Sequence, residues 1–329
     1  MSAGRKALIG LAVLLALALA GAAAAFLAAR HAIDSQIRHI DTSLGASAQS
    51  APASPRSGQS DARGDDLTFL VLGSDSRQSG GDPTDWRAGA QRSDVMMLVQ
   101  ITGDRRGVNV MSIPRDSWVD IPGHGRAKIN AAYSYGGPDL TIRTVEQLTG
   151  TTIDHFMVTD FTSFERLTDV LGGVSIASHD GVRTYTGSEA LDFVRERHSL
   201  PRGDFDRVRR QQAWMRAIFQ GVFSKSVLTD PGRLSEMVSI VLKYSAVDQG
   251  LDASALLSLA SEMTGVRSNS VRFFTAPFTG TGTSEDGQSI VSLDEEALAS
   301  LMEAWESDSV GAYLDRHPEI DSLGSGPVA

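Results

Sequence analysis

A run of arginines between residues 189 and 216 is the most unusual chemical feature of the sequence. Seven arginines lie in this stretch, although the chain of 329 residues has a formal net charge of −10. Crowded cations repel one another, and guanidinium groups bind phosphate oxygens in pairs and stay charged at any working pH. The run therefore indicates an anionic ligand. The simpler alternative is a solvated charged face, or ion pairs with the neighbouring carboxylates: Glu189, Glu196, Asp204 and Asp206.

Four side chains of this run are candidates for contacting such a ligand. Arg195 and Arg197 flank Glu196 at the end of one expected helix. After a Pro-Arg-Gly break, Arg207 and Gln211 stand four residues apart, which places both on one face of the next helix. These positions combine fixed charge with a neutral amide, a combination suited to holding a phosphate group.

Two aspartates upstream are candidates for a metal site. Asp75 and Asp94 stand near the two ends of a long polar segment that follows an apolar run. Two carboxylates close to a cluster of arginines would bind Mg²⁺ or Mn²⁺, hard cations that often share ligands with phosphate oxygens. Taken alone, each aspartate is equally well explained as a turn residue or the first residue of a strand.

Further donors stand at the ends of other expected elements. Arg77, Arg92 and Arg115 lie at the edges of three different elements, and Arg115 directly follows a very apolar strand and a proline. A charge in that position is either a satisfied surface residue or part of a ligand site. Lys128 and Asn130, at a glycine-rich turn into a helix, could add donors, and surface turn chemistry explains them equally well.

Apolar runs that alternate with helical patterns must position these side chains. Strands are predicted at 67–73, 94–102 and 107–114, the last two joined as a hairpin by a Gly-Asp-Arg-Arg-Gly turn. The polar segment opens at the C-terminal end of the first strand, where ligands bind in open α/β sheets. Alternation of strands and helices predicts an α/β layered fold with a mixed sheet. The other expected elements are strands at 155–160 and 271–277, a Gly/Thr/Ser loop after 277, and helices at 138–150, 161–173, 231–243, 253–264 and 294–306.

The N-terminal region predicts a membrane anchor. Residues 7–29 carry no charge and are long enough to cross the hydrocarbon core. Arg5 and Lys6 precede them, which favours a cytoplasmic stretch at 1–6 and an extracytoplasmic remainder. The alternative is a cleaved signal peptide, but the apolar run is longer than the usual signal core. Residues 30–65 are predicted to be a flexible linker, 66–306 a single domain, and 307–329 a disordered tail.

Composition excludes several classes of function. Cysteine is absent, which excludes disulfides, thiolate metal sites and a cysteine nucleophile. The sequence pI near 5.2 argues against nucleic acid as the main partner, because binding to a phosphate backbone favours a basic surface.

Five motifs, in order and spacing, resemble the LytR-CpsA-Psr family: LVLGSDSR (70–77), RSDVMMLVQI (92–101), VMSIPRDSWV (110–119), KINAAYSYGGP (128–138) and VRERHSLPRGDFDRVRRQQ (194–212). The resemblance covers about residues 66–225 and extends more weakly to about 306. It implies an extracytoplasmic three-layer α/β/α sandwich. It also implies transfer of a glycopolymer from a polyprenyl-pyrophosphate carrier to peptidoglycan, with a divalent metal that is usually Mg²⁺.

The same resemblance implies roles for individual residues. Asp75 and Asp94 match the metal ligands. Arg77 matches a position that varies more in the family, and residues 80–90 are an insertion with no counterpart in the pattern. The residues that match the pyrophosphate-binding positions are Arg92, Arg115, Arg195, Arg197, Arg207 and Gln211.

The chemistry implied is attack of a wall-sugar hydroxyl on the sugar-linked phosphorus, with arginines and the metal stabilising charge on the phosphate oxygens. Arg92 and Arg115 are the candidates for that stabilisation, and Asp75 and Asp116 are alternative general bases. A pyrophosphatase that cleaves polyprenyl pyrophosphate with water is the rival closest in chemistry. A membrane-anchored transcriptional attenuator is disfavoured by the expected topology and by the acidic charge.

Overall fold

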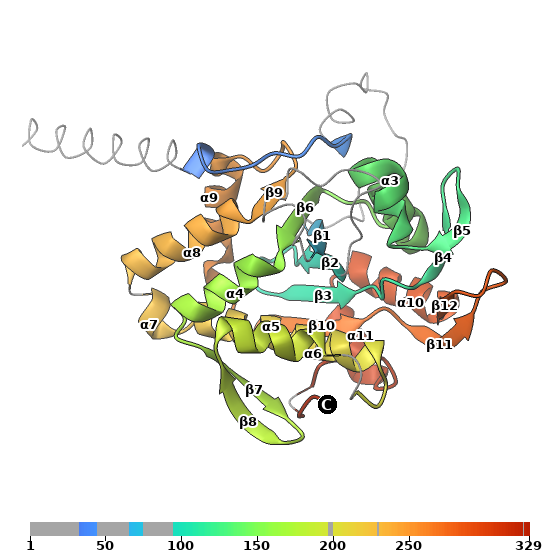
Figure 1. Ribbon diagram of the computed structural model, residues 1–329. Coiled ribbons are helices and arrows are strands. Elements are labelled where there is room, and N and C mark those ends of the chain that lie inside the picture. Colours follow the sequence, from blue (N-terminus) through green and yellow to red (C-terminus); the bar gives the residue numbers. More distant parts are fainter. Residues whose placement is uncertain (1–32, 45–65, 75–94, 197–199, 229, 325) are drawn as a thin grey trace, which may run out of the picture.

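The computed structural model describes residues 33–44, 66–74, 95–196, 200–228, 230–324 and 326–329 (Figure 1). The predicted anchor at 7–29 and the cytoplasmic stretch at 1–6 lie outside these residues. Within the described ranges, no helix combines the length and the apolar character needed to cross a membrane.

A six-stranded mixed sheet forms the centre of the domain, in the order β10-β3-β2-β1-β6-β9. Strands β10, β3, β1 and β6 run in one direction, and β2 and β9 run in the other. All five predicted strands are confirmed, whereas the three-residue β9 was not predicted. The bounds are β1 Leu67–Ser74, β2 Val95–Ile101, β3 Val108–Ser112, β6 His155–Asp160, β9 Ser245–Val247 and β10 Val271–Thr275.

Helices cover both faces of this sheet (Figure 1). Side chains alternate between the two faces of a strand, so each strand contributes to two separate cores. Leu72 packs in one core with Leu140 of α3 and Trp305 of α10. Met97 packs in the other core with Trp214 of α6. The expected mixed α/β architecture with layers on both sides of the sheet is confirmed.

The remaining elements follow the local signals of the sequence. Helix α3 is kinked at Gly136 and Gly137, directly before Pro138, and it ends at Gly150, whose φ of 73° is the left-handed conformation typical of a C-terminal glycine. The helix bounds are α3 Ala131–Thr149, α4 Phe161–Val170, α5 Gly187–Arg195, α6 Asp204–Val222, α7 Lys225–Leu228, α8 Pro231–Lys243, α9 Ala253–Glu262, α10 Glu295–Glu306 and α11 Val310–Arg316, with short 3₁₀ turns at Met263–Gly265 and Ser268–Ser270.

Three two-stranded ribbons project from the layers. They are β4 Trp118–Ile121 with β5 Gly125–Lys128, β7 Val174–Ser178 with β8 Gly181–Tyr185, and β11 Phe278–Thr283 with β12 Ser289–Leu293. The last ribbon corrects the sequence interpretation, because the residues after 277 were predicted to form a loop. Its glycines and threonines gave no clear alternation of apolar residues, because β11 is largely exposed and the buried residues of β12 are the adjacent Ile290 and Val291.

Part of the predicted flexible linker is docked on the domain. Residues 33–44 run along the β9 edge of the sheet, where Ile40 donates to the Val247 carbonyl (2.9 Å) and Val247 donates to the Arg38 carbonyl (2.9 Å). The Asp34 carboxylate also accepts from the N–H of Ala253 (3.0 Å). An edge strand has backbone groups that need partners, and this segment supplies them. The prediction of a flexible linker is therefore wrong for these residues.

The predicted disordered tail is wrong where the structure describes it. Helix α11 buries Val310 and Tyr313. Beyond it, Ser322 pairs with Phe274 of β10, and Val328 pairs with Ser178 of β7. Small and polar residues made the segment look disordered, but its partners lie far away in the sequence.

Candidate functional site

The candidate site lies at the edge of the sheet where the four parallel strands end. Gly73 of β1 pairs with Val95 of β2, and Ser112 ends β3 opposite Met97. Ligands of open α/β sheets bind beyond such carboxyl ends. The chain leaves β1 after Ser74 and enters β2 at Val95. These two residues directly precede Asp75 and directly follow Asp94, the predicted metal ligands, and both stand at this edge. The predicted residues Asp75, Arg77, Arg92 and Asp94 themselves lie outside the described residues.

Four predicted residues are brought together beyond the end of β3. Arg115 Nε lies 3.7 Å from Asp116 Oδ2, and Lys128 Nζ lies 3.0 Å from Asp116 Oδ1. The N–H of Asn130 donates to the carbonyl of Arg115 (3.2 Å). The three charged side chains are each about one-fifth exposed (18%, 20% and 21%). They form a partly shielded group that a ligand can still reach.

Backbone hydrogen bonds hold this group in place. The N–H of Ser117 donates to the Pro114 carbonyl (2.9 Å), which closes a turn around Arg115 and Asp116. The Asp116 carbonyl accepts from the N–H of Val291 in β12 (2.9 Å). The turn is thus fixed to another part of the chain, so its side chains have a defined direction.

Arg207 and Gln211 lie in the first half of α6, as predicted. Arg207 is 3% exposed and Gln211 is 9% exposed. An arginine is almost never so deeply buried unless it is paired, so Arg207 has a specific place inside the protein and is not part of a solvated face.

Gln212 is a residue that positions α6, and the sequence interpretation missed it. Its Nε2 donates to Ser112 Oγ (3.0 Å) and to the Phe274 carbonyl (3.1 Å), and its side chain is fully buried. These bonds clamp α6 over the ends of β3 and β10. The signal was available, because Gln212 stands on the same helical face as the buried Val208 and Met215. A polar residue on an apolar face needs a polar partner.

The start of α6 is held by a second contact. The ring of Phe205 stacks on that of Phe278 in β11, with a centroid distance of 4.1 Å. Strand β11 pairs with β12, whose Val291 N–H donates to the carbonyl of Asp116 in the turn. Two routes therefore bring the first turns of α6 to the carboxyl edge: through Gln212 and through Phe205.

Arg195 is the last residue of α5 and is half-buried, so the predicted helix end is confirmed. Helix α5 begins where Glu189 accepts from the N–H of Thr186 (2.9 Å). Near its other end, the Phe193 carbonyl accepts from Arg210 Nη1 of α6 (3.0 Å). This contact brings the end of α5 to α6. Arg197 lies outside the described residues.

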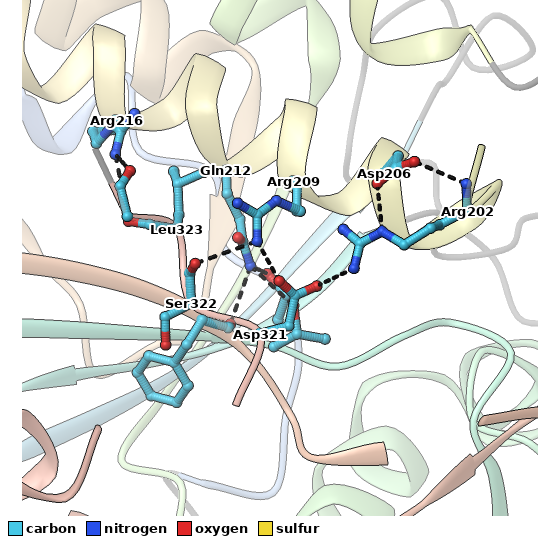
Figure 2. A network of polar contacts seen from close by, with 12 residues as sticks. Arg202, Asp206, Arg209, Gln212, Arg216, Asp321, Ser322 and Leu323 are labelled. Atoms are coloured by element: carbon cyan, nitrogen blue, oxygen red, sulfur yellow. Dashed lines mark hydrogen bonds and ion pairs between the residues drawn. The ribbon is translucent and has the colours of Figure 1, made fainter. Parts of the chain in front are cut away.

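The other arginines of the run bind the protein itself. Figure 2 shows Arg202 and Arg209 converging on the carboxylate of Asp321. Arg202 also pairs with Asp206, Nε to Oδ1 at 2.8 Å. Arg216 donates to the Leu323 carbonyl (3.4 Å). The alternative of ion pairs is thus correct for this part of the run, although the main carboxylate partner is in the C-terminal segment.

Burial affects two of these cations, and a neighbouring charge affects one of them. Burial lowers the pKa of the Arg216 guanidinium, and the neighbouring charge of Arg209 lowers it further. Burial likewise lowers the pKa of Arg210. The carboxylate of Asp321 offsets part of this repulsion on the face of α6 that carries Arg209. Arg207 and Gln211, four residues apart, lie together on a different face of the helix.

The proposed metal ligands are not among the described residues, and among those that are, no group of three or more histidine or carboxylate side chains is placed to hold a metal ion. The structure describes the positions that lead into the site, Ser74 and Val95 on adjacent paired strands.

The protein is a mixed α/β sandwich with partly shielded cations, Arg115 and Lys128, beyond the carboxyl end of β3. A sequence profile of the LytR_cpsA_psr family matches residues 31–307. The chain belongs to this family, as its motifs indicated.

Individual relatives agree with this assignment. The cell wall biosynthesis protein LcpA of Corynebacterium glutamicum is 30% identical over 313 residues, which cover 78% of this chain and 60% of LcpA. The probable cell wall biosynthesis protein LcpB of the same organism is 34% identical over 218 residues, which cover 60% of this chain and 52% of LcpB. The chain therefore spans only about half to three-fifths of these relatives.

Solved structures share the fold. TagT of B. subtilis is 25% identical with a TM-score of 0.56, and the match covers 75% of this chain and 91% of TagT. TagT bound to LI-WTA is 26% identical with the same TM-score, and the match covers 78% of this chain and 95% of that one.

Proposed function

We propose that this protein transfers a glycopolymer from a polyprenyl-pyrophosphate carrier to peptidoglycan and forms a phosphodiester link during cell-wall assembly. The observation that supports this most directly is the buried Arg207, on a helix clamped over the same edge that Arg115 and Lys128 approach. Family membership, the cell-wall role in the name of LcpA and the wall teichoic acid bound by TagT support it further.

The diphosphate would be held by arginines from separate elements. Arg115 after β3 and Arg207 in α6 supply guanidinium forks, which match phosphate oxygens with two hydrogen bonds each. Lys128 and Asn130 add donors at the same turn, and Gln211 adds an amide. The same role is proposed for the remaining predicted arginines: Arg77, Arg92, Arg195 and Arg197.

The reaction would be a displacement at phosphorus. A hydroxyl of the peptidoglycan acceptor attacks the sugar-linked phosphorus, a new O–P bond forms, and the bond to polyprenyl phosphate breaks. The arginines stabilise the charge that develops on the leaving oxygen. Both oxygens of Asp116 contact cations, Lys128 and Arg115. We therefore assign Asp116 to positioning these cations, and Asp75 as the base that takes the hydroxyl proton.

Asp75 and Asp94 would hold Mg²⁺, with Mn²⁺ as the alternative. Their carboxylates are the ligand type that such hard cations favour, and the bound ion would neutralise charge on the phosphate oxygens.

The docked linker suits a substrate carried by a membrane. Residue 33 stands four positions after the end of the predicted anchor at residue 29. Four residues span at most about 14 Å. The β9 edge of the sheet would therefore lie close to the extracytoplasmic surface of the membrane that holds the anchor. We propose a single-pass membrane protein with this domain outside the cytoplasm, beside a lipid carrier and within reach of peptidoglycan.

Transfer can be measured with the full chain in detergent, Mg²⁺, a short-chain polyprenyl-pyrophosphate glycan and peptidoglycan. The expected products are polyprenyl phosphate and glycan bound to peptidoglycan through a phosphodiester. Release of polyprenyl phosphate with free phosphorylated glycan would instead assign the protein as a pyrophosphatase. Absence of both cleavage and donor binding would overturn the proposed site.

A further inference from the structure

A cavity near the candidate site has no role in the chemistry proposed above. Its volume is about 530 Å³, within the usual range for small-molecule sites. Its walls come from the β4–β5 ribbon, the C-terminal end of α3, the end of β12 and the first turn of α10. The side chains that matter most are Trp118, Asp120, Arg126, Gln147, Glu295 and Leu298.

Strand β4 joins the cavity to the candidate site along the chain. Trp118 stands two residues after Asp116, so their Cα atoms are at most about 7 Å apart. Trp118 also pairs across the ribbon with Lys128, whose Nζ binds Asp116 at 3.0 Å. One wall of the cavity therefore begins where the charged group of the site ends. The short separation of Asp116 and Trp118 would let one ligand contact both the charged group and the cavity.

The ribbon keeps Trp118 available to a ligand. Along β4, Val119 and Ile121 are buried in the core, Trp118 is half-buried and Asp120 is exposed. Arg126 donates through Nη2 to the Trp118 carbonyl (3.0 Å), which ties the two strands together at this point. The indole ring is held on a rigid ribbon at the cavity wall.

The chemistry of the lining disfavours two parts of the lipid donor, the charged diphosphate and the polyprenyl chain. Asp120 and Glu295 outnumber Arg126, so the cavity does not suit a diphosphate. Gln147 and these charged groups interrupt the apolar part of the lining, and a polyprenyl chain would cover them without giving them hydrogen-bond partners. A sugar needs both donors and acceptors for its hydroxyls, and a flat aromatic ring on which its C–H face can pack. The cavity supplies all of these.

We propose that this cavity is a glycan subsite, formed around Trp118, that binds the peptidoglycan acceptor and presents its hydroxyl to the site at Asp116. The proposal rests on the transfer function proposed above and names the place of its second substrate. The glycan in this cavity could belong to the acceptor or to the donor. Variants of the cavity distinguish the two, because they should raise the KM only for the substrate whose glycan binds there.

The test is to compare Trp118→Ala with the unchanged full chain in detergent. The KM for soluble uncrosslinked peptidoglycan should rise at least tenfold, while the KM for the lipid donor stays within twofold. Gln147→Ala, an exposed position in the last turn of α3, should move the acceptor KM in the same direction and guards against misfolding of the tryptophan variant. Tyr244→Ala, a half-buried aromatic at the opposite side of the sheet, is the matched control and should leave both values unchanged.

Binding without the donor separates this proposal from the transfer function. The unchanged protein should bind a peptidoglycan tetrasaccharide in calorimetry, and Trp118→Ala should lose that binding. Binding that is lost in Trp118→Ala supports the subsite even if no transfer is measured. Transfer with an unchanged acceptor KM in both cavity variants would overturn the subsite and leave the proposed function intact. A raised donor KM alone would overturn the acceptor assignment and place the donor glycan here.

Discussion

Lys128 Nζ lies 3.0 Å from Asp116 Oδ1, across the join between the turn after β3 and the end of β5. The opposite oxygen of Asp116 lies 3.7 Å from Arg115 Nε. One carboxylate therefore sets the position of two cations at the candidate site. This geometry bears on Asp116, which the sequence left as one of two candidates for the general base.

Asp116→Asn should raise the KM for the lipid donor about tenfold, equivalent to about 1.4 kcal/mol, because Arg115 and Lys128 lose the charge that positions them. The kcat should fall less than tenfold. A loss of kcat on the order of 10² to 10⁴ with an unchanged KM would instead identify Asp116 as the general base. Steady-state kinetics distinguish the two results, and Asp180→Asn, at an exposed turn, is the control.

Arg207→Lys should weaken binding of a short-chain polyprenyl pyrophosphate, because lysine keeps the charge but loses the planar fork. The ligand should stabilise the unchanged protein by about 2.7 kcal/mol at a hundred times its dissociation constant. Thermal unfolding with Mg²⁺, with and without the ligand, measures this shift. Arg143→Lys, at an exposed position on α3, should keep the full shift. Equal shifts in the two variants would move the diphosphate away from Arg207.

Asp75→Ala and Asp94→Ala should each reduce transfer at least a hundredfold, and chelation should do the same to the unchanged protein, because the proposed Mg²⁺ needs both carboxylates. The activity lost to chelation should return on addition of Mg²⁺ or Mn²⁺. Full activity in excess chelator would remove the metal from the mechanism.

Asp321→Asn should destabilise the fold, because Arg202 and Arg209 both converge on this carboxylate (Figure 2). Removing one partner of a hydrogen-bonded charge pair costs about 1.5–3 kcal/mol, which predicts a fall of several degrees in the melting temperature. Asp315→Asn, at an exposed position on α11, should leave the melting temperature unchanged. If both variants melt like the parent, the C-terminal segment is not held by this carboxylate.

Stability should depend on pH through Asp248. Burial raises the pKa of this carboxylate, but hydrogen bonds from His155 and from the N–H groups of Phe156 and Gly250 outweigh burial, so its pKa lies below the ordinary value. A lowered pKa in the folded state gives stabilisation that is complete above the unfolded value, about 4, and is lost as the pH falls through the folded value.

Urea unfolding of residues 33–329 between pH 3 and 7 checks this expectation. The free-energy difference between the parent and Asp248→Asn should be largest above about pH 5 and should shrink below about pH 4. A difference that is constant over this range would mean that the carboxylate is not preferentially ionised in the folded state.

Local pattern was enough to predict much of this protein. Continuous apolar runs identify β1, β2 and β3, because strands of a covered central sheet are buried on both faces. Pro138 and Gly150 mark the ends of the second half of α3, because each residue's own backbone conformation favours the start or the end of a helix. The four-residue spacing of Arg207 and Gln211 places both on one face of a helix, because helix geometry depends only on near neighbours. The motifs also identify the family and, with it, a candidate for the chemistry.

Tertiary structure decided which residues meet. The partner of Arg209 is Asp321, 112 positions away, and no periodicity in either segment indicates that pairing. The β9 edge captures residues 38–40 through backbone groups that every residue has, so a composition typical of a linker could not exclude docking. Gln212 became a clamp only because β3 and β10 end beneath it. Sequence determines elements through interactions between near neighbours, whereas contacts between distant segments depend on how the elements pack, and that packing assembles the site.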